Sequence, residues 1–208
     1  MTSVYRAAIL LMLGAAPAAA QDDWAGIHLG AALVTNRVQL GAQGDLRDDL
    51  DQQGIDAQLF SPSGEAAALR VGRDWQYGNL VLGIAAEYQA GSASAGADDA
   101  RIAELLMQPQ VSLTRNARLF GRIGYAAGDW MPYALAGQDV ARLHISGAAQ
   151  ASGDIRGNSL GLGLEHRVNP QISTFAEYSQ TQFDPLPGAE DQLDLSRKDL
   201  RVGASFRF

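Results

Sequence analysis

The chain has 208 residues, a formal net charge of −7 and no cysteine. This length is enough for one domain with a full core, and the lack of cysteine excludes disulfides and thiol chemistry. The excess of acidic residues argues against nucleic-acid binding, because such binding requires cations that neutralise phosphates.

The first twenty residues have the composition of a secretory signal peptide. Arg6 is followed by an apolar run from Ala7 to Ala16 and then by Ala18-Ala19-Ala20. A basic start, a short apolar run and small residues at the cleavage site are typical of such segments. The run is too short to span a bilayer as a helix, which takes about 20 residues. We predict cleavage near Ala20 and one domain over residues 21–208, with a net charge of −8 because the removed segment carries one Arg and no acid.

Residues 21–208 contain eight segments in which apolar and polar side chains alternate. The clearest is 80–89, where large apolar side chains from Leu80 to Tyr88 share one face while Gly83 and Glu87 lie on the other. This period of two is typical of β-strands. Pro109 makes one of the segments weaker, because proline cannot donate to a strand ladder. The predicted strands are 24–34, 67–75, 80–89, 102–113, 118–127, 158–167, 171–183 and 197–208.

The connections between these strands alternate between long and short. The long ones are 35–64, 90–99, 128–153 and 184–196, and the short ones are 76–79, 114–117 and 169–170. Outer-membrane barrels have an even number of strands, short periplasmic turns and longer outer loops, and each tilted strand needs about 9–11 residues to cross the bilayer. We therefore predict an all-β fold: an eight-stranded antiparallel up-and-down transmembrane β-barrel with four long outer loops and three short periplasmic turns.

Two features favour a membrane barrel over a secreted soluble ligand-binding barrel, whose apolar faces would point inward. Glycines collect on the charged faces, as a narrow lumen requires. Aromatic residues collect near strand ends, as at membrane interfaces. The predicted interface aromatics are Trp24, Trp75, Phe206 and Phe208 toward one side, and Tyr88 and Tyr125 toward the other.

Four segments together resemble the small outer-membrane β-barrel family of Gram-negative bacteria, the porin-like or outer-membrane immunogenic protein type. They are 23–30 (DWAGIHLG), 160–167 (LGLGLEHR), 176–178 (AEY) and 202–208 (VGASFRF). The resemblance covers essentially the whole mature chain. It implies insertion by the outer-membrane barrel assembly machinery, which in this family reads a C-terminal aromatic such as Phe208.

Charged residues on the glycine-rich faces are expected to meet inside the barrel. They are Arg70, Glu87, Glu104, Arg122, Glu165, Glu177, Asp199 and Arg201. One interpretation is an ion or proton path. The other, which we favour, is a network of ion pairs that plugs the lumen, because isolated charges there are costly and eight strands leave room only for side chains.

Two further motifs are weak candidates for sites. The segment 49–54 (DLDQQG) partly matches a calcium loop, but Phe60 stands where the bidentate Glu is required. His144 and Ser146 would share one face of an extended segment and could serve acyl hydrolysis, as in lipid A deacylases, although no acid stands at a convincing spacing. His28 and His166 lie on other strands and form no ligand cluster. We expect no cofactor and no metal.

The sequence therefore predicts a non-enzymatic outer-membrane barrel with a plugged lumen and a structural or surface-interaction role through its loops. The expected partners are outer-membrane lipids, lipopolysaccharide and the assembly machinery, with no nucleic acid. The loops are acidic and rich in small residues, so no particular loop ligand is indicated. The alternative functions are an outer-membrane lipid hydrolase and the soluble ligand-binding barrel.

Overall fold

A computed structural model describes residues 24–42, 44–52, 58–60, 63–96, 110–146, 151–185 and 193–208. Within these residues the chain forms nine strands and one helix. They are β1 (Gly26–Ala42), α2 (Gly44–Gln52), β2 (Gln58–Phe60), β3 (Ser63–Tyr77), β4 (Leu80–Gly96), β5 (Gln110–Tyr125), β6 (Trp130–Ser146), β7 (Ala151–Arg167), β8 (Ile172–Phe183) and β9 (Leu193–Arg207). The described helix lacks the length and apolar composition needed to cross a bilayer.

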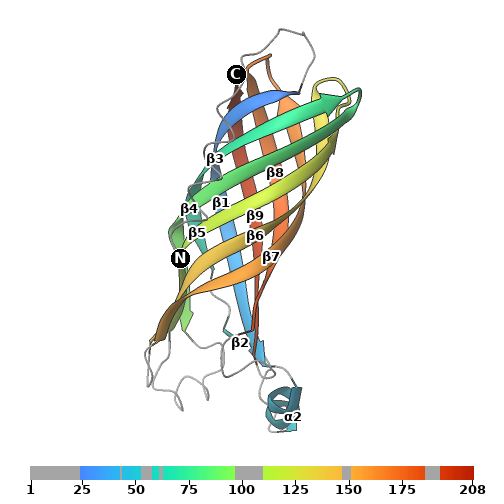
Figure 1. Cartoon of the computed structure of the whole chain (residues 1–208). Coiled ribbons are helices and arrows are strands. Elements are labelled where there is room, and N and C mark those ends of the chain that lie inside the picture. The colour runs from blue at the N-terminus through green and yellow to red at the C-terminus, as the bar shows by residue number, and fades with distance from the viewer. Residues whose placement is uncertain are drawn as a thin grey trace, which may run out of the picture.

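Eight of the strands close into one antiparallel barrel. Their order is β1-β3-β4-β5-β6-β7-β8-β9, and β9 pairs back onto β1. The short β2 pairs only with the end of β1. The strands run at a slant around a tall barrel, with α2 beyond its lower end (Figure 1). This closed up-and-down topology confirms the predicted fold class.

The seam between β1 and β9 brings the two ends of the strand series together. Its pairing runs from His28 opposite Arg207 to Ala42 opposite Leu193. The Phe208 amide then donates to the Ile27 carbonyl at 2.9 Å. The start of β1 and the end of β9 thus lie at one end of the barrel, the upper end in Figure 1.

The same end carries three short connections, at 78–79, 126–129 and 168–171. In the first, Gly78 has φ +61°, a left-handed conformation that tight hairpins require and that glycine adopts without strain. We call the end of the barrel that carries these three connections the turn end, and the opposite end the loop end. The first and third of these turns confirm the prediction.

The middle of the chain departs from the prediction in two places. Residues 114–117, predicted as a turn, lie inside β5, which passes through a bulge at Arg115 with φ 49°. Residues 128–153, predicted as an irregular outer loop, contain β6. The connection after β6 spans only residues 147–150, so the third outer loop is not long. The number of barrel strands is nevertheless the predicted eight, because the prediction divides β5 into two strands and leaves out β6.

The outer surface of the barrel is apolar, and the inner surface carries the charged residues together with apolar clusters. Leu33 is 76% exposed, and Leu69 and Leu160 are each 68% exposed. The inward-facing residues that alternate with the exposed ones are mostly buried, and in β8 exposed and buried residues alternate at every position. The apolar faces therefore point outward, which is the reverse of a soluble ligand-binding barrel.

Candidate functional site

The lumen is filled by charged side chains that alternate with the outward apolar ones. Within the described residues, the buried members are six arginines and six carboxylates, and each of them makes at least one ion pair with another. Their formal charges cancel. They are Arg70, Arg118, Arg122, Arg197, Arg201, Arg207, Asp74, Glu87, Asp139, Glu165, Glu177 and Asp199.

The group nearest the turn end contains two arginines and two carboxylates. Arg122 donates to both oxygens of Asp74, at 2.9 and 2.6 Å, and to Glu165 at 2.8 Å. Arg207 donates to Asp74 at 2.9 Å. Ser173 adds a hydroxyl hydrogen bond to Glu165. Such two-pronged arginine–carboxylate contacts are among the strongest polar interactions in proteins and fix both partners in orientation.

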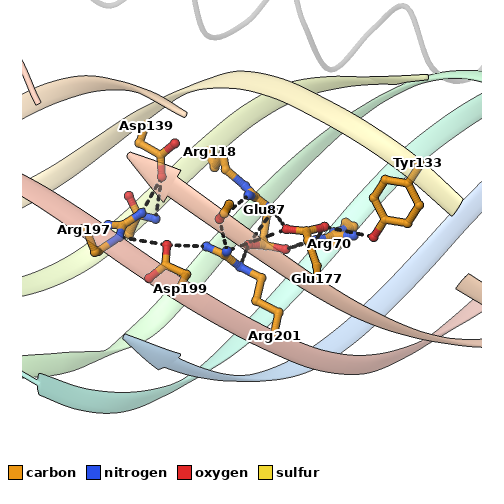
Figure 2. Close-up of polar contacts among 11 residues, drawn as sticks. Arg70, Glu87, Arg118, Tyr133, Asp139, Glu177, Arg197, Asp199 and Arg201 are labelled. Atoms are coloured by element: carbon orange, nitrogen blue, oxygen red, sulfur yellow. Dashed lines mark hydrogen bonds and ion pairs between the residues drawn. The ribbon is translucent and has the colours of Figure 1, made fainter. Parts of the chain in front are cut away.

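The central group is built around Glu87 and Glu177 (Figure 2). Arg70 donates to Glu87 at 2.7 and 2.9 Å and to Glu177 at 3.0 Å. Arg118 donates to Glu177 at 2.6 Å, and Arg201 donates to Glu87 at 2.9 Å. The contacts join β3, β4, β5, β8 and β9, so they cross the lumen rather than follow its wall.

A chain of ion pairs continues from the central group toward the loop end. Arg201 donates to Asp199 at 3.0 Å, and Arg197 donates to the same carboxylate at 2.9 Å. Arg197 also donates to Asp139 at 2.6 Å, which in turn accepts from Asn116 at 3.1 Å. Figure 2 shows this chain running along the lumen from Asp139 to Tyr133.

Aromatic side chains fill the space between the charged groups. The Arg70 guanidinium lies 4.8 Å from the Phe120 ring centroid and 4.6 Å from that of Phe175. The Tyr133 hydroxyl donates to Glu177 at 3.1 Å. Cation–π contacts of this kind gain strength where water is excluded. The lumen is thus packed with paired charges and rings.

Glycines on the neighbouring strands make room for these long side chains. A Cβ on Gly83 would collide with the Asp74 carboxylate, and one on Gly163 would collide with the Tyr133 ring. A cavity lined by Asn36, Gln89, Asn116 and Arg197 lies in the described part of the lumen and measures about 10 Å³. That is about the space of one water molecule.

The comparisons with known proteins agree with this architecture. The model of the outer membrane protein beta-barrel domain matches residues 7–208. The chain belongs to the outer-membrane β-barrel family. In this family short turns face the periplasm, so the turn end of the barrel lies on the periplasmic side and the loop end faces outward.

Two solved outer-membrane barrels are similar in structure. Ail, the attachment invasion locus protein of Yersinia pestis, has 12% identity and a TM-score of 0.54, covering 89% of this chain and 100% of Ail. Neisserial surface protein A has 12% identity and a TM-score of 0.50, covering 86% of this chain and 97% of that protein. No curated protein matches the sequence. At such identities the likeness shows the fold alone, so function is argued from this chain's own residues.

The structure places seven of the eight sequence-predicted lumen charges inside the outer-membrane barrel, and Glu104 lies outside the described residues. Five further members of the network were missed: Asp74, Arg118, Asp139, Arg197 and Arg207. Four of these share the face of predicted members on segments already assigned as strands, so the alternation alone could have found them. Asp139 could not be found that way, because the sequence pattern predicts a long connection over 128–153, where the structure has β6.

Five of the six predicted interface aromatics face outward on the membrane barrel. They are Trp75, Tyr88, Tyr125, Phe206 and Phe208. Tyr125, however, lies at the turn end, because it pairs with Leu80 next to the first turn. Its predicted place on the opposite side followed from the misplaced turn at 114–117.

Trp24 does not face the membrane: it is only 1% exposed and closes the turn end of the lumen. The guanidinium of Arg167 lies 4.9 Å from a Trp24 ring centroid, and that of Arg207 lies 5.8 Å from it. The indole N–H donates to the Gly128 carbonyl at 3.3 Å. The correction has a simple cause, since Trp24 has the same parity as the inward-facing His28.

The remaining candidate motifs lie apart from the network. Residues 49–52 of the partial calcium motif are helical in α2, so they do not form a calcium-binding loop, and residues 53–54 lie outside the described residues. His144 is exposed on β6, and its neighbours across the ladder are Ser112 and Ser152. Within the described residues, no three His, Cys, Asp or Glu side chains are grouped closely enough to hold a metal ion.

Proposed function

We propose that the protein is a non-enzymatic outer-membrane barrel whose lumen is closed by its own side chains, with a structural or surface-interaction role through its extracellular loops. The observation that supports this proposal is the neutral network of six arginines and six carboxylates inside the barrel. A diffusing ion would have to displace side chains that are held to one another across the lumen.

The cost of such displacement is high because each charge is buried. Breaking one partner out of a buried ion pair costs about 3–5 kcal/mol, and Glu177 alone contacts Arg70, Arg118 and Arg201 within 3.6 Å. Most members of the network have more than one partner, so opening one pair also disturbs others. This interpretation favours a plug over an ion or proton path.

The proposed partners follow from the surfaces of the barrel. The apolar outer face contacts outer-membrane lipids, including lipopolysaccharide in the outer leaflet. The assembly machinery reads Phe208, which is 61% exposed beside the β1–β9 seam. Export by a signal peptide that is cleaved near Ala20 precedes this step.

Conductance in planar lipid bilayers tests the closed lumen. The purified protein, first shown to be folded by a heat-dependent shift in gel mobility, is expected to give no stable current steps. Stable, reproducible steps from the folded protein would overturn the proposal.

The hydrolase alternative, with Ser146 and His144, is tested in cells that overexpress the protein. Mass spectrometry of lipid A from overexpressing cells is expected to show unchanged acylation. Loss of an acyl chain in these cells, but not in cells that express His144→Ala, would establish the hydrolase instead.

A further inference from the structure

Two cations face each other on the outer wall of the barrel. Arg37 on β1 is directly opposite Lys198 on β9 in the strand register. Arg37 is exposed, and its chain neighbours Asn36 and Val38 are buried, so its side chain points away from the lumen. Directly opposite residues of an antiparallel pair have Cβ atoms about 4.5–5.5 Å apart, and like charges at this spacing repel.

No acid stands directly opposite either cation in the sheet. The next residues across the sheet are Ser63 beside Arg37 and Gln180 beside Lys198. Glu65 is the diagonal neighbour on β3. Within the described part of the chain, neither cation has a carboxylate at ion-pair distance. The wall therefore presents two positive charges with a hydroxyl and an amide on either side.

The pair lies at the outer border of the apolar band. On β9 the outward residues Phe206, Val202 and Leu200 are exposed and apolar, and Lys198 is the next outward residue toward the loop end. On β8 the same border falls between Tyr178 and Gln180. The band thus ends where lipid headgroups begin, and the loop end faces the outer leaflet.

We propose that Arg37 and Lys198, with Gln180, bind a phosphate group of lipopolysaccharide in the outer leaflet. The inference deepens the proposed contact with outer-membrane lipids and rests on it. A phosphate between the two cations relieves their repulsion and gains charge-assisted hydrogen bonds from both. Lipid is favoured over free phosphate because the cations border the surface that acyl chains cover.

The opposite wall offers a matched control. Arg142 on β6 is directly opposite Asp154 on β7, and the backbone carbonyl of Arg156 accepts from the amide of Asp184. These arginines are also exposed, but each lies next to an acid: Arg142 is opposite Asp154 in the ladder, and Arg156 lies beside Asp184, just after β8. Replacing both removes the same charge from the same kind of surface without touching the proposed site.

The test measures binding of lipid A to the purified barrel in uncharged detergent, by titration with the diphosphorylated form and with its dephosphorylated form. The R37Q/K198Q variant is expected to bind diphosphorylated lipid A at least about tenfold more weakly than the wild type. The R142Q/R156Q variant should stay within about twofold of the wild type, because its arginines already have acidic neighbours. A heat-dependent gel shift confirms that each variant is folded.

Three results would overturn the proposal: equal affinity of R37Q/K198Q and wild type, an equal loss in the control variant, or equal binding of dephosphorylated lipid A. Displacement of lipid A by equimolar inorganic phosphate would also overturn it, since the site would then be one for the free anion. The molecular mass of the lipid A recovered after titration is determined by mass spectrometry, to detect loss of an acyl chain. A lost acyl chain would refute the non-enzymatic function while leaving the binding result intact.

Discussion

At the scale of single residues, Glu177 is the carboxylate on which the central network depends. Its two oxygens accept from Arg118 at 2.6 Å, Arg70 at 3.0 Å and Tyr133 at 3.1 Å. It is 1% exposed, so water cannot take over any of these contacts. Its charge balances arginines from β3, β5 and β9 together.

Replacing Glu177 with Gln should therefore destabilise the folded barrel by about 3–5 kcal/mol, because it leaves buried arginines without a partner. Urea unfolding in detergent micelles, followed by intrinsic fluorescence, measures the change. Asp154→Asn, at an exposed position of β7, is the matched control and should change stability by less than about 0.5 kcal/mol. Equal unfolding midpoints for Glu177→Gln and the wild type would show that the ion pairs contribute little.

At the scale of elements, the bulge in β5 explains why this strand was predicted as two. Arg115 adopts φ 49°, and the pairing with β4 and β6 shifts register around it. The bulge lets Leu113 and Asn116 both point inward although they are three residues apart. A bulge of this kind breaks the alternation on which strand prediction depends.

The left-handed conformation at Arg115 predicts opposite effects for two substitutions. Arg115→Val should destabilise the barrel by about 1–2 kcal/mol, because a β-branched residue is strained at positive φ. Arg115→Gly should leave stability unchanged or slightly raised. Urea unfolding measures both, with Ala117→Val on the regular part of β5 as the control. Equal tolerance of Val at 115 and 117 would argue against a strained bulge.

The strand β6 was missed for a different physical reason. Its inward residues Met131, Tyr133 and Leu135 are apolar, while its outward residues include the small Ala134 and Ala136. The usual contrast between an apolar outer face and a polar inner face is therefore reversed, and Pro132 further weakens the pattern. By contrast β4, β7, β8 and β9 alternate cleanly and could be predicted from the sequence.

At the scale of the whole molecule, the sequence was enough to predict the class of barrel but not which side chains contact one another in the lumen. Alternation predicts which side of a strand is buried. It therefore identified seven of the charged residues that lie in the lumen. It says nothing of which charges meet, because Arg201 and Glu87 are 114 positions apart. Trp24 shows the same limit, since only the closed barrel places it between Arg167 and Arg207.

Contacts that cross the lumen predict that the barrel unfolds as one unit. In the variant W75F/W130F, Trp24 is the only remaining tryptophan and reports on the turn end of the lumen. Its fluorescence in urea should change at the same midpoint as the loss of the compact gel band, because two-state unfolding gives coincident transitions. An earlier change of the Trp24 signal would instead show that the turn end opens separately.

The ion pairs connect strands that are distant in the sequence, and this affects how the chain inserts into a bilayer. Arg70 on β3 and Arg118 on β5 both pair with Glu87 on β4 and with Glu177 on the distant β8, and Arg201 on β9 also pairs with Glu87. A partly inserted sheet would lack some of these carboxylates, and a guanidinium group left without its acid against hydrocarbon costs about 2–4 kcal/mol near the midplane. The charges of the network balance only when β9 adds its three arginines and one carboxylate, and the pairing of β9 with β1 then closes the barrel around them. We infer that the final strand serves as an assembly checkpoint: release of the chain from its insertion machinery becomes favourable once the circle is complete.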